Sequence, residues 1–360
     1  MSRIRKVALL PLVVLFLAFI SAPLFAQAST DPYYEFLMGC HLEGQGDTLA
    51  ALEAFERAVK LAPTSSTLHA EIAAFYFRQN RSDEAKKFAR EALDLDSKNI
   101  EAQRVLGLVL SVNSTLAVAS EAVNYLKQVV TSPSGATDFQ VQFNLGRLYL
   151  LTDDFTGAIK VLQQLVVQRP YFSQARLMLA RAQKAAGLND AAIDTLESAE
   201  YVNTRRYDQF QLYSTLGQYY EDATRWASAA EAYARALAIS PEDRDLRIRR
   251  ASMLLVLSGR DNVSQALNVL NTLFERNRLD ADALYLQSQA YRSLGNLFQA
   301  EQAAREILAL EPNSQRGAYA LSQVFSQGHR YQDVIDYLEG FLALPSSDGK
   351  ASIALFSYLA

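Results

Sequence analysis

The stretch FQLYSTLGQYYEDATRWASAAEAYARALAISP, residues 210–241, decides the fold of this chain. Gly217 and Ala229 carry almost nothing beyond the backbone, so the two helices that contain them can approach closely. The aromatic ring of Tyr233 fills the wedge beside this contact. Pro241 cannot continue a helix, so the chain must turn there. The stretch therefore predicts two helices joined as a hairpin.

The same spacing recurs along the chain, and its pattern resembles the tetratricopeptide repeat, a helix hairpin of about 34 residues. The small residue of the first helix recurs at Gly39, Ala73, Gly107, Gly146, Ala180 and Gly217. The resemblance covers about nine repeats over residues 31–347 and implies an all-α, right-handed α-solenoid of tetratricopeptide hairpins. Residues 348–360 then read as the start of a further repeat helix, which predicts either a longer natural product or a helix that docks on a partner.

The first residues of the chain predict export. Arg3, Arg5 and Lys6 precede an apolar run over residues 7–20, which is typical of a secretory signal peptide, here residues 1–28. A retained membrane anchor is the alternative, although the run is shorter than the roughly 20 residues of a spanning helix. Cleavage removes three positive and no negative charges, so the formal charge changes from −4 to −7. We therefore expect a periplasmic or otherwise extracytoplasmic protein, with no stable membrane span after cleavage and no nucleic acid partner.

Several connections depart from the regular spacing. We expect enlarged hairpin turns at residues 113–120 and 259–263, and a long connector at residues 200–209. A turn-rich break follows the third repeat, at residues 131–136.

Side chains that could catalyse a reaction or bind a metal are scattered along the sequence. The three histidines, His41, His69 and His329, fall in different repeats without a metal-binding spacing, and we expect each at the surface or in the groove. No set of catalytic side chains recurs, so the sequence predicts a non-enzymatic protein with no cofactor and no metal.

The resemblance also implies a binding face, because the first helices of such hairpins line a concave groove that holds extended peptides or partner helices. Carried onto this chain, the groove positions are Arg78, Arg104, Arg147, Arg181, Lys184, Gln218, Tyr285, Gln289, Arg292, Tyr319 and Gln323. The basic members predict capture of an acidic segment, because guanidinium groups bind carboxylates in bidentate fashion. The alternative is that the arginines are solvated or paired with nearby glutamates. The two tyrosines are either interface anchors or packing residues.

The resulting prediction is a protein-protein interaction scaffold or adaptor of the cell envelope, similar in kind to exported bacterial tetratricopeptide repeat proteins. The alternative is the N-terminal targeting region of a longer envelope enzyme whose catalytic domain lies beyond Ala360.

Overall fold

The structure is a computed structural model that describes residues 31–112, 115–198, 206–274 and 280–342. The chain divides into two compact units, unit 1 up to Asn144 and unit 2 from Leu145 onward. The predicted signal peptide and the predicted terminal helix over residues 348–360 lie outside the described residues.

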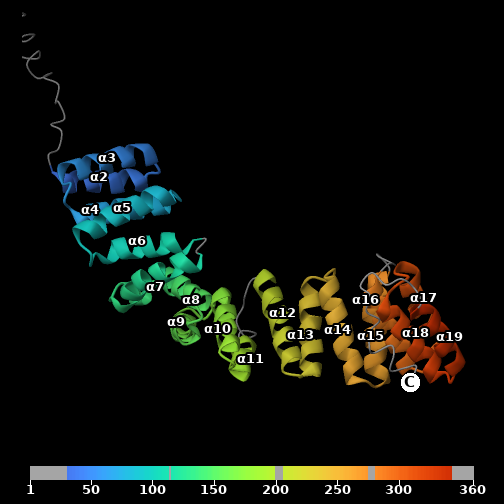
Figure 1. The fold of residues 1–360 in the computed structure, drawn as a ribbon. Helices are drawn as coiled ribbons and strands as arrows, with labels where there is room; N and C mark the ends of the chain where they lie inside the picture. The colour runs from blue at the N-terminus through green and yellow to red at the C-terminus, as the bar shows by residue number, and fades with distance from the viewer. Residues whose placement is uncertain (1–30, 113–114, 199–205, 275–279, 343–360) are drawn as a thin grey trace, which may run out of the picture. The chain divides into compact units, whose positions relative to one another are not determined.

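Unit 1 consists of helix hairpins whose consecutive helices pack side by side (Figure 1). Its helices are α2 (Pro32–Gly44), α3 (Thr48–Leu61), α4 (Ser66–Arg78), α5 (Ser82–Leu95), α6 (Ile100–Ser111) and α7 (Leu116–Thr131). The short 3₁₀ helix η1 (Gly135–Thr137) leads into α8 (Phe139–Leu151), which crosses the division between the units.

Unit 2 continues the same arrangement. Its helices are α9 (Phe155–Gln168), α10 (Ser173–Ala185), α11 (Asn189–Glu197), α12 (Arg206–Asp222), α13 (Trp226–Ile239), α14 (Arg244–Leu257), α15 (Arg260–Phe274), α16 (Ala281–Ser293), α17 (Leu297–Leu310), α18 (Gln315–Gln327) and α19 (Tyr331–Leu342). Over the described residues, eighteen α-helices form nine hairpins and no strand is present. The predicted all-α solenoid of about nine hairpins is confirmed.

Small residues bring the two helices of a hairpin together, as predicted, but their direct neighbour is a large side chain. A Cβ added to Gly217 would lie 2.5 Å from the ring of Tyr233, and one added to Gly39 would lie 2.5 Å from the ring of Phe55. Gly146 meets Leu162 in the same way, at 2.6 Å. In these three hairpins the first helix therefore offers a notch that receives a residue sixteen positions later on the second helix, and Gly107 receives Leu126, nineteen positions later, in the hairpin with the enlarged turn.

The hairpin turns depend on left-handed backbone conformations. Every described hairpin turn contains at least one residue with φ between 57° and 83°: Gly46, Asn80, Asp153, Gly187, Thr224, Gly295, His329, and both Ser258 and Gly259 in the turn between α14 and α15. Thr224 and Ser258 are the unusual members, because Asn, Asp and His adopt this region more readily than other residues with a Cβ. The packing of the two helices thus imposes the turn even where the residue type does not favour it.

Three predicted connections are shorter than expected. Helix α7 begins at Leu116, since its first turns bury Ala119, so helix replaces most of the predicted turn over residues 113–120. Between α14 and α15 only Ser258 and Gly259 intervene, because two consecutive left-handed residues reverse the chain within a short distance. Helix α12 begins at Arg206, so residues 206–209 are helical rather than part of the connector.

No helix in the described ranges combines the length and the apolar character needed to cross a bilayer.

Candidate functional site

Within each unit, some first helices of neighbouring hairpins approach one another. Helix α4 contacts α6 in unit 1, and in unit 2 α10 contacts α12, α14 contacts α16, and α16 contacts α18. Second helices of neighbouring hairpins show no comparable contact in the described parts of either unit. Stacked hairpins that converge on one side are concave there. We call this side the first-helix face of each unit, and most of the predicted groove residues belong to it.

Arg78 of unit 1 is held by a carboxylate of the preceding repeat. At the end of α4, its Nε and Nη2 atoms donate to the two carboxylate oxygens of Glu43, at the end of α2, over 2.9 and 2.8 Å. The hydrogen bond to Glu43 raises the pKa of Arg78 above its usual value. The guanidinium that the sequence predicted as a groove cation therefore joins two first helices.

Arg104 is bound in the same manner. Its Nε donates to Asp138 over 2.6 Å, and its Nη1 donates to Glu101 over 3.3 Å. Asp138 also accepts hydrogen bonds from the backbone N–H groups of Gln140 and Val141, so it caps the start of α8. One carboxylate thus satisfies a helix terminus and a guanidinium from the preceding repeat.

In unit 2, Lys184 of α10 reaches the next first helix. Its Nζ lies 3.1 Å from a carboxylate oxygen of Asp222, and it stands over the ring of Tyr219 at 5.3 Å from the ring centre. An ammonium over an aromatic face gains from the ring quadrupole in addition to the ion pair. The predicted groove cation is again partnered within the array.

The neighbouring acidic residue, Glu221, is held from the opposite direction. The Tyr233 hydroxyl donates to it over 2.6 Å, and Nη1 of Arg249 on α14 donates to it over 2.9 Å. Burial and then this hydrogen bond raise the pKa of Tyr233. The acidic pair at the end of α12 is therefore bound by the repeat before it and the repeat after it.

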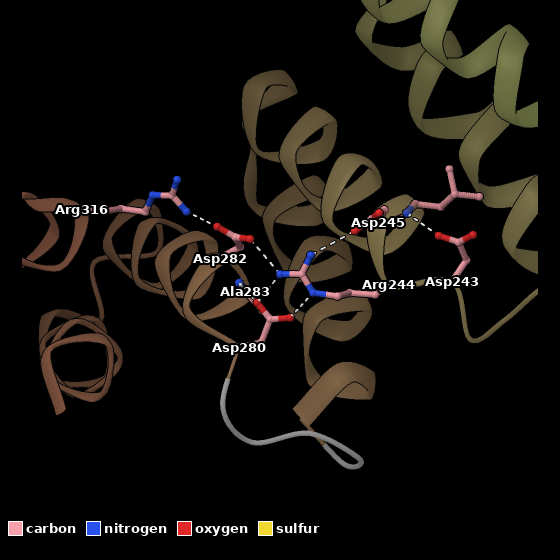
Figure 2. Close-up of polar contacts among 8 residues, drawn as sticks. Asp243, Arg244, Asp245, Asp280, Asp282, Ala283 and Arg316 are labelled. Carbon is pink, nitrogen blue, oxygen red and sulfur yellow. Dashed lines mark hydrogen bonds and ion pairs between the residues drawn. The ribbon is translucent and has the colours of Figure 1, made fainter. Parts of the chain in front are cut away.

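The densest set of contacts lies at the starts of α14, α16 and α18 (Figure 2). The Nε and Nη2 atoms of Arg244 donate to both carboxylate oxygens of Asp280, over 2.5 and 2.8 Å. Nη2 also donates to Asp282 over 2.8 Å, and Nη1 to Asp245 over 3.0 Å. Arg316 completes the set by donating to Asp282. These five residues, which we call the Arg244 cluster, join three consecutive repeats.

The Arg244 cluster is partly removed from water. The side chain of Asp280 is only 5% exposed, and it also accepts from the backbone N–H of Ala283, capping α16. Burial alone would raise the pKa of Asp280, but hydrogen bonds from Arg244 and Ala283 hold that pKa below its usual value. A polar hollow of about 530 Å³ adjoins the cluster. Since both of its arginines are bound to carboxylates, this hollow offers an anion no uncommitted guanidinium.

Four other predicted groove residues are also found on unit 2. Arg181 and Gln218 are exposed, whereas Arg147 and Gln289 are half-buried. Arg181 is in no ion pair with a described residue; its charge acts on the hydroxyl of Tyr219, one repeat further along. Arg181 and Gln218 are therefore the predicted residues most open to a partner.

The last two first helices contain the predicted aromatic and polar set. The half-buried rings of Tyr285 and Tyr319 pack against the hydrophobic core, and Arg316 stands 5.6 Å from the centre of the Tyr285 ring. Arg292 of α16 donates to the side chains of Gln323 and Gln327 of α18. Both tyrosines therefore act as packing residues over the buried part of their rings.

Sequence reasoning missed a recurring polar residue four positions before the small residue of the first helix. Gln103, Gln142 and Arg176 each donate from a side-chain nitrogen to the backbone carbonyl six residues earlier, over 2.9, 2.8 and 3.1 Å. His69 occupies the same position. It is buried instead of lying at the surface or in the groove, with Nδ1 2.9 Å from the carbonyl oxygen of Ser65. A search for polar residues at one fixed offset could have found this set.

Groups that suit metal chemistry are absent from the described ranges, where no three His, Cys, Asp or Glu side chains gather closely enough to hold an ion. A hollow of about 750 Å³ lies in unit 2 between the second helices α11 and α13, and Leu216 and Tyr220 of α12 also line it. The predicted groove residues do not line it.

Two family models with the description tetratricopeptide repeat match the sequence. One matches residues 42–109, and the other matches residues 143–209 and again residues 255–315. Together they cover more than half of the chain. None of the curated proteins compared with the sequence matches it.

Solved structures with a similar fold include other repeat proteins. YrrB, described as a TPR protein with an unusual peptide-binding site, is 20% identical with a TM-score of 0.47, over 54% of this chain and 95% of its own. PilF of Pseudomonas aeruginosa is 18% identical with a TM-score of 0.45, over 61% of this chain and 97% of its own. PilW, described as a widely conserved type IV pilus biogenesis factor, is 16% identical with a TM-score of 0.37, over 81% of this chain and 98% of its own.

Proposed function

Since the chain belongs to the tetratricopeptide repeat family, we propose that it is a non-enzymatic scaffold of the cell envelope, which binds extended or helical segments of partner proteins on its first-helix faces. Such a protein acts by displaying a long preformed surface. Many modest contacts then supply the affinity, and charge sets orientation and encounter rate.

The observation that carries this proposal is the set of side-chain contacts between successive first helices. Lys184 with Asp222, Arg249 with Glu221, and the Arg244 cluster each join neighbouring repeats of unit 2. Because these contacts fix the first helices relative to one another, a partner would meet side chains whose positions are already set. Preorganisation of this kind lowers the entropic cost of binding.

Arg181 and Arg147 support capture of an acidic segment by unit 2. Arg181 is exposed, and Gln218 lies one repeat further along with an exposed amide. A partner carboxylate at Arg181 would gain a bidentate contact, and an adjacent backbone group could bond to Gln218. Replacing Arg147 and Arg181 together by Glu should weaken capture and reduce its salt dependence. Circular dichroism should show unchanged helicity, and unaltered capture by the double variant would refute the acidic-ligand proposal.

Photo-crosslinking in the native cells tests the first-helix face directly. A photoreactive residue at Gln218, exposed on α12, should crosslink to a defined partner. The matched control is Gln164, an exposed glutamine on the second helix α9, which should give no such product. Equal crosslinking at both positions, or none at Gln218, would contradict the proposed face.

The envelope location rests on the basic and apolar residues at the start of the sequence. It predicts that the protein isolated from its own cells begins at Ser29 and is found outside the cytoplasm. An intact mass that includes residues 1–28, in a cytoplasmic fraction, would contradict it.

A further inference from the structure

The first-helix face of unit 1 has the opposite charge from the one that its arginines suggest. Along α2, α4 and α6 it presents Glu43, Glu71 and Glu101 together with Arg78 and Arg104, and Asp138 lies beside Arg104. Both guanidinium groups are bound by Glu43, Glu101 and Asp138. Four carboxylates against two cations leave this face negative.

Glu71 is the carboxylate that remains. It is half-buried in the middle of α4, and it forms no hydrogen bond or ion pair with any other residue that the structure describes. Its charge acts on both sides. Partial burial and then Glu71 and Glu43 raise the pKa of Cys40 on α2, against an opposing effect of Arg78. Burial raises the pKa of Glu101 on α6, against Arg104, and Glu71 adds to the rise. The charge of Glu71 therefore acts on groups of both neighbouring first helices.

An apolar strip borders this negative region. Tyr33, Leu37 and Cys40 are spaced i, i+4 and i+7 along α2, so they share one side of the helix. Tyr33 is 62% exposed, Leu37 is 65% exposed, and Cys40 is exposed as well. Glu43 lies three residues after Cys40 on the same helix, and its carboxylate is bonded to Arg78 of α4, so the strip borders the carboxylates.

We propose that this surface binds a basic amphipathic segment of a partner protein, with its apolar side chains on Tyr33 and Leu37 and a lysine or arginine beside Glu71. This inference rests on the proposed scaffold function and adds the chemistry of one partner. Charge complementarity selects the occupant, since an acidic segment would have to displace the carboxylates already bound to Arg78 and Arg104. A second copy of unit 1 would bring the same negative charge to the contact.

Cys40 provides a native probe, because it is the only cysteine of the chain. The rates of its reaction with a cationic and an anionic methanethiosulfonate of similar size should differ. Relative to free cysteine, the cationic reagent should be favoured by about 3- to 10-fold at low salt. The ratio of the cationic to the anionic reaction rate, relative to free cysteine, should fall toward one in Glu71→Gln. It should also fall in high salt, where screening shortens the range of the electrostatic field. The control is Glu53→Gln, an exposed glutamate on α3, which should retain the preference.

Two outcomes of the labelling experiment would overturn the proposal. A preference for the anionic reagent would mean that the face is positive. Slow reaction with both reagents that persists at a pH where the Cys40 thiol is ionised would mean that another segment already covers the strip.

Binding of two designed peptides completes the test. Both carry the same apolar helical pattern, and their polar positions are lysine in one and glutamate in the other. Fluorescence anisotropy should show that the full chain binds the lysine peptide more tightly, and that Glu71→Gln and Leu37→Ala each reduce this affinity several-fold. Lysine-peptide affinity that is unchanged in Glu71→Gln, or lost in Glu53→Gln alone, would refute the proposal. Binding of the glutamate peptide that is sensitive to Arg181→Glu, with no binding of the lysine peptide, would show that the scaffold function stands while this inference fails.

Discussion

Replacing Gly217 with alanine should destabilise the protein, even though alanine favours a helix more than glycine does. The added Cβ would lie 2.5 Å from Cε1 and 2.6 Å from Cδ1 of Tyr233, whereas ordinary contacts begin at 3.4 Å. The ring, or one of the two helices, must therefore move by about 1 Å to restore normal carbon contacts.

Tyr233 has little freedom to make this movement. Its side chain is 0% exposed, and its hydroxyl donates to Glu221 over 2.6 Å. Overpacking of a core costs about 1 to 3 kcal/mol, and weakening the buried hydrogen bond adds about 1 kcal/mol. The higher helix propensity of alanine offsets about 1 kcal/mol. We expect Gly217→Ala to lower the free energy of unfolding by about 1 to 3 kcal/mol.

The matched control is Gly340→Ala in helix α19. A Cβ on Gly340 meets no atom of a described residue within 4 Å, so the helix-propensity term should dominate and stabilise by about 1 kcal/mol. The same substitution thus has opposite signs at two helical positions. Urea unfolding followed by circular dichroism gives the comparison, provided that the midpoint and the m value are both recorded. Gly217→Ala with a midpoint equal to or above that of Gly340→Ala would refute the steric reasoning and the register of the hairpin.

Further predictions concern the Arg244 cluster and one buried tyrosine. Arg244→Gln should lower the free energy of unfolding by about 2 kcal/mol, because the buried carboxylate of Asp280 loses its bidentate partner. Arg305→Gln, which removes an exposed i,i+4 pair with Glu301, should lower it by only about 0.5 kcal/mol. Equal losses in urea unfolding would contradict this ranking. Hydrogen bonds from Arg244 and Arg316 hold the pKa of Asp282 below its usual value. The stability that this carboxylate contributes is therefore present above its unfolded pKa of about 4, and it is lost as the pH falls through the lower folded pKa. The stability difference between the native chain and Arg244→Gln should therefore shrink below about pH 4, and a difference that grows on acidification would be the contrary result. Burial raises the pKa of Tyr337 to about 12, so a difference in phenolate absorbance between the native chain and Tyr337→Phe should titrate near that pH, and a step near pH 10 would argue against burial of this hydroxyl.

The fold could be predicted because its determinants repeat within each hairpin. Gly39, Gly146 and Gly217 each face a large side chain sixteen positions later. The residues that meet this steric requirement are therefore close in the sequence and recur in several hairpins. Turn lengths were harder to predict. Ser258 adopts a left-handed conformation that its side chain does not favour, and tertiary packing of α14 against α15 imposes it.

The candidate site was predictable only as a choice of face. The resemblance placed Arg78, Arg104 and Lys184 on first helices, and the structure finds them there. Each has a partner 34 to 38 positions away, on the neighbouring repeat, and Arg104 has a second partner, Glu101, on its own helix. Helical periodicity says which side of a helix a residue occupies, but the rotation and offset between hairpins decide which two side chains meet.

The sequence by itself therefore determined the class of the protein, the hairpin count and the side of each helix that packs inward, since small and aromatic residues at fixed offsets leave few other ways to bury them. Tertiary structure alone decided which charges neutralise one another. Coulombic and hydrogen-bond energies depend on the separation of atoms from different repeats. The sequence showed arginines on the first helices of unit 1, but only the structure showed which carboxylates lie beside them and leave that face negative.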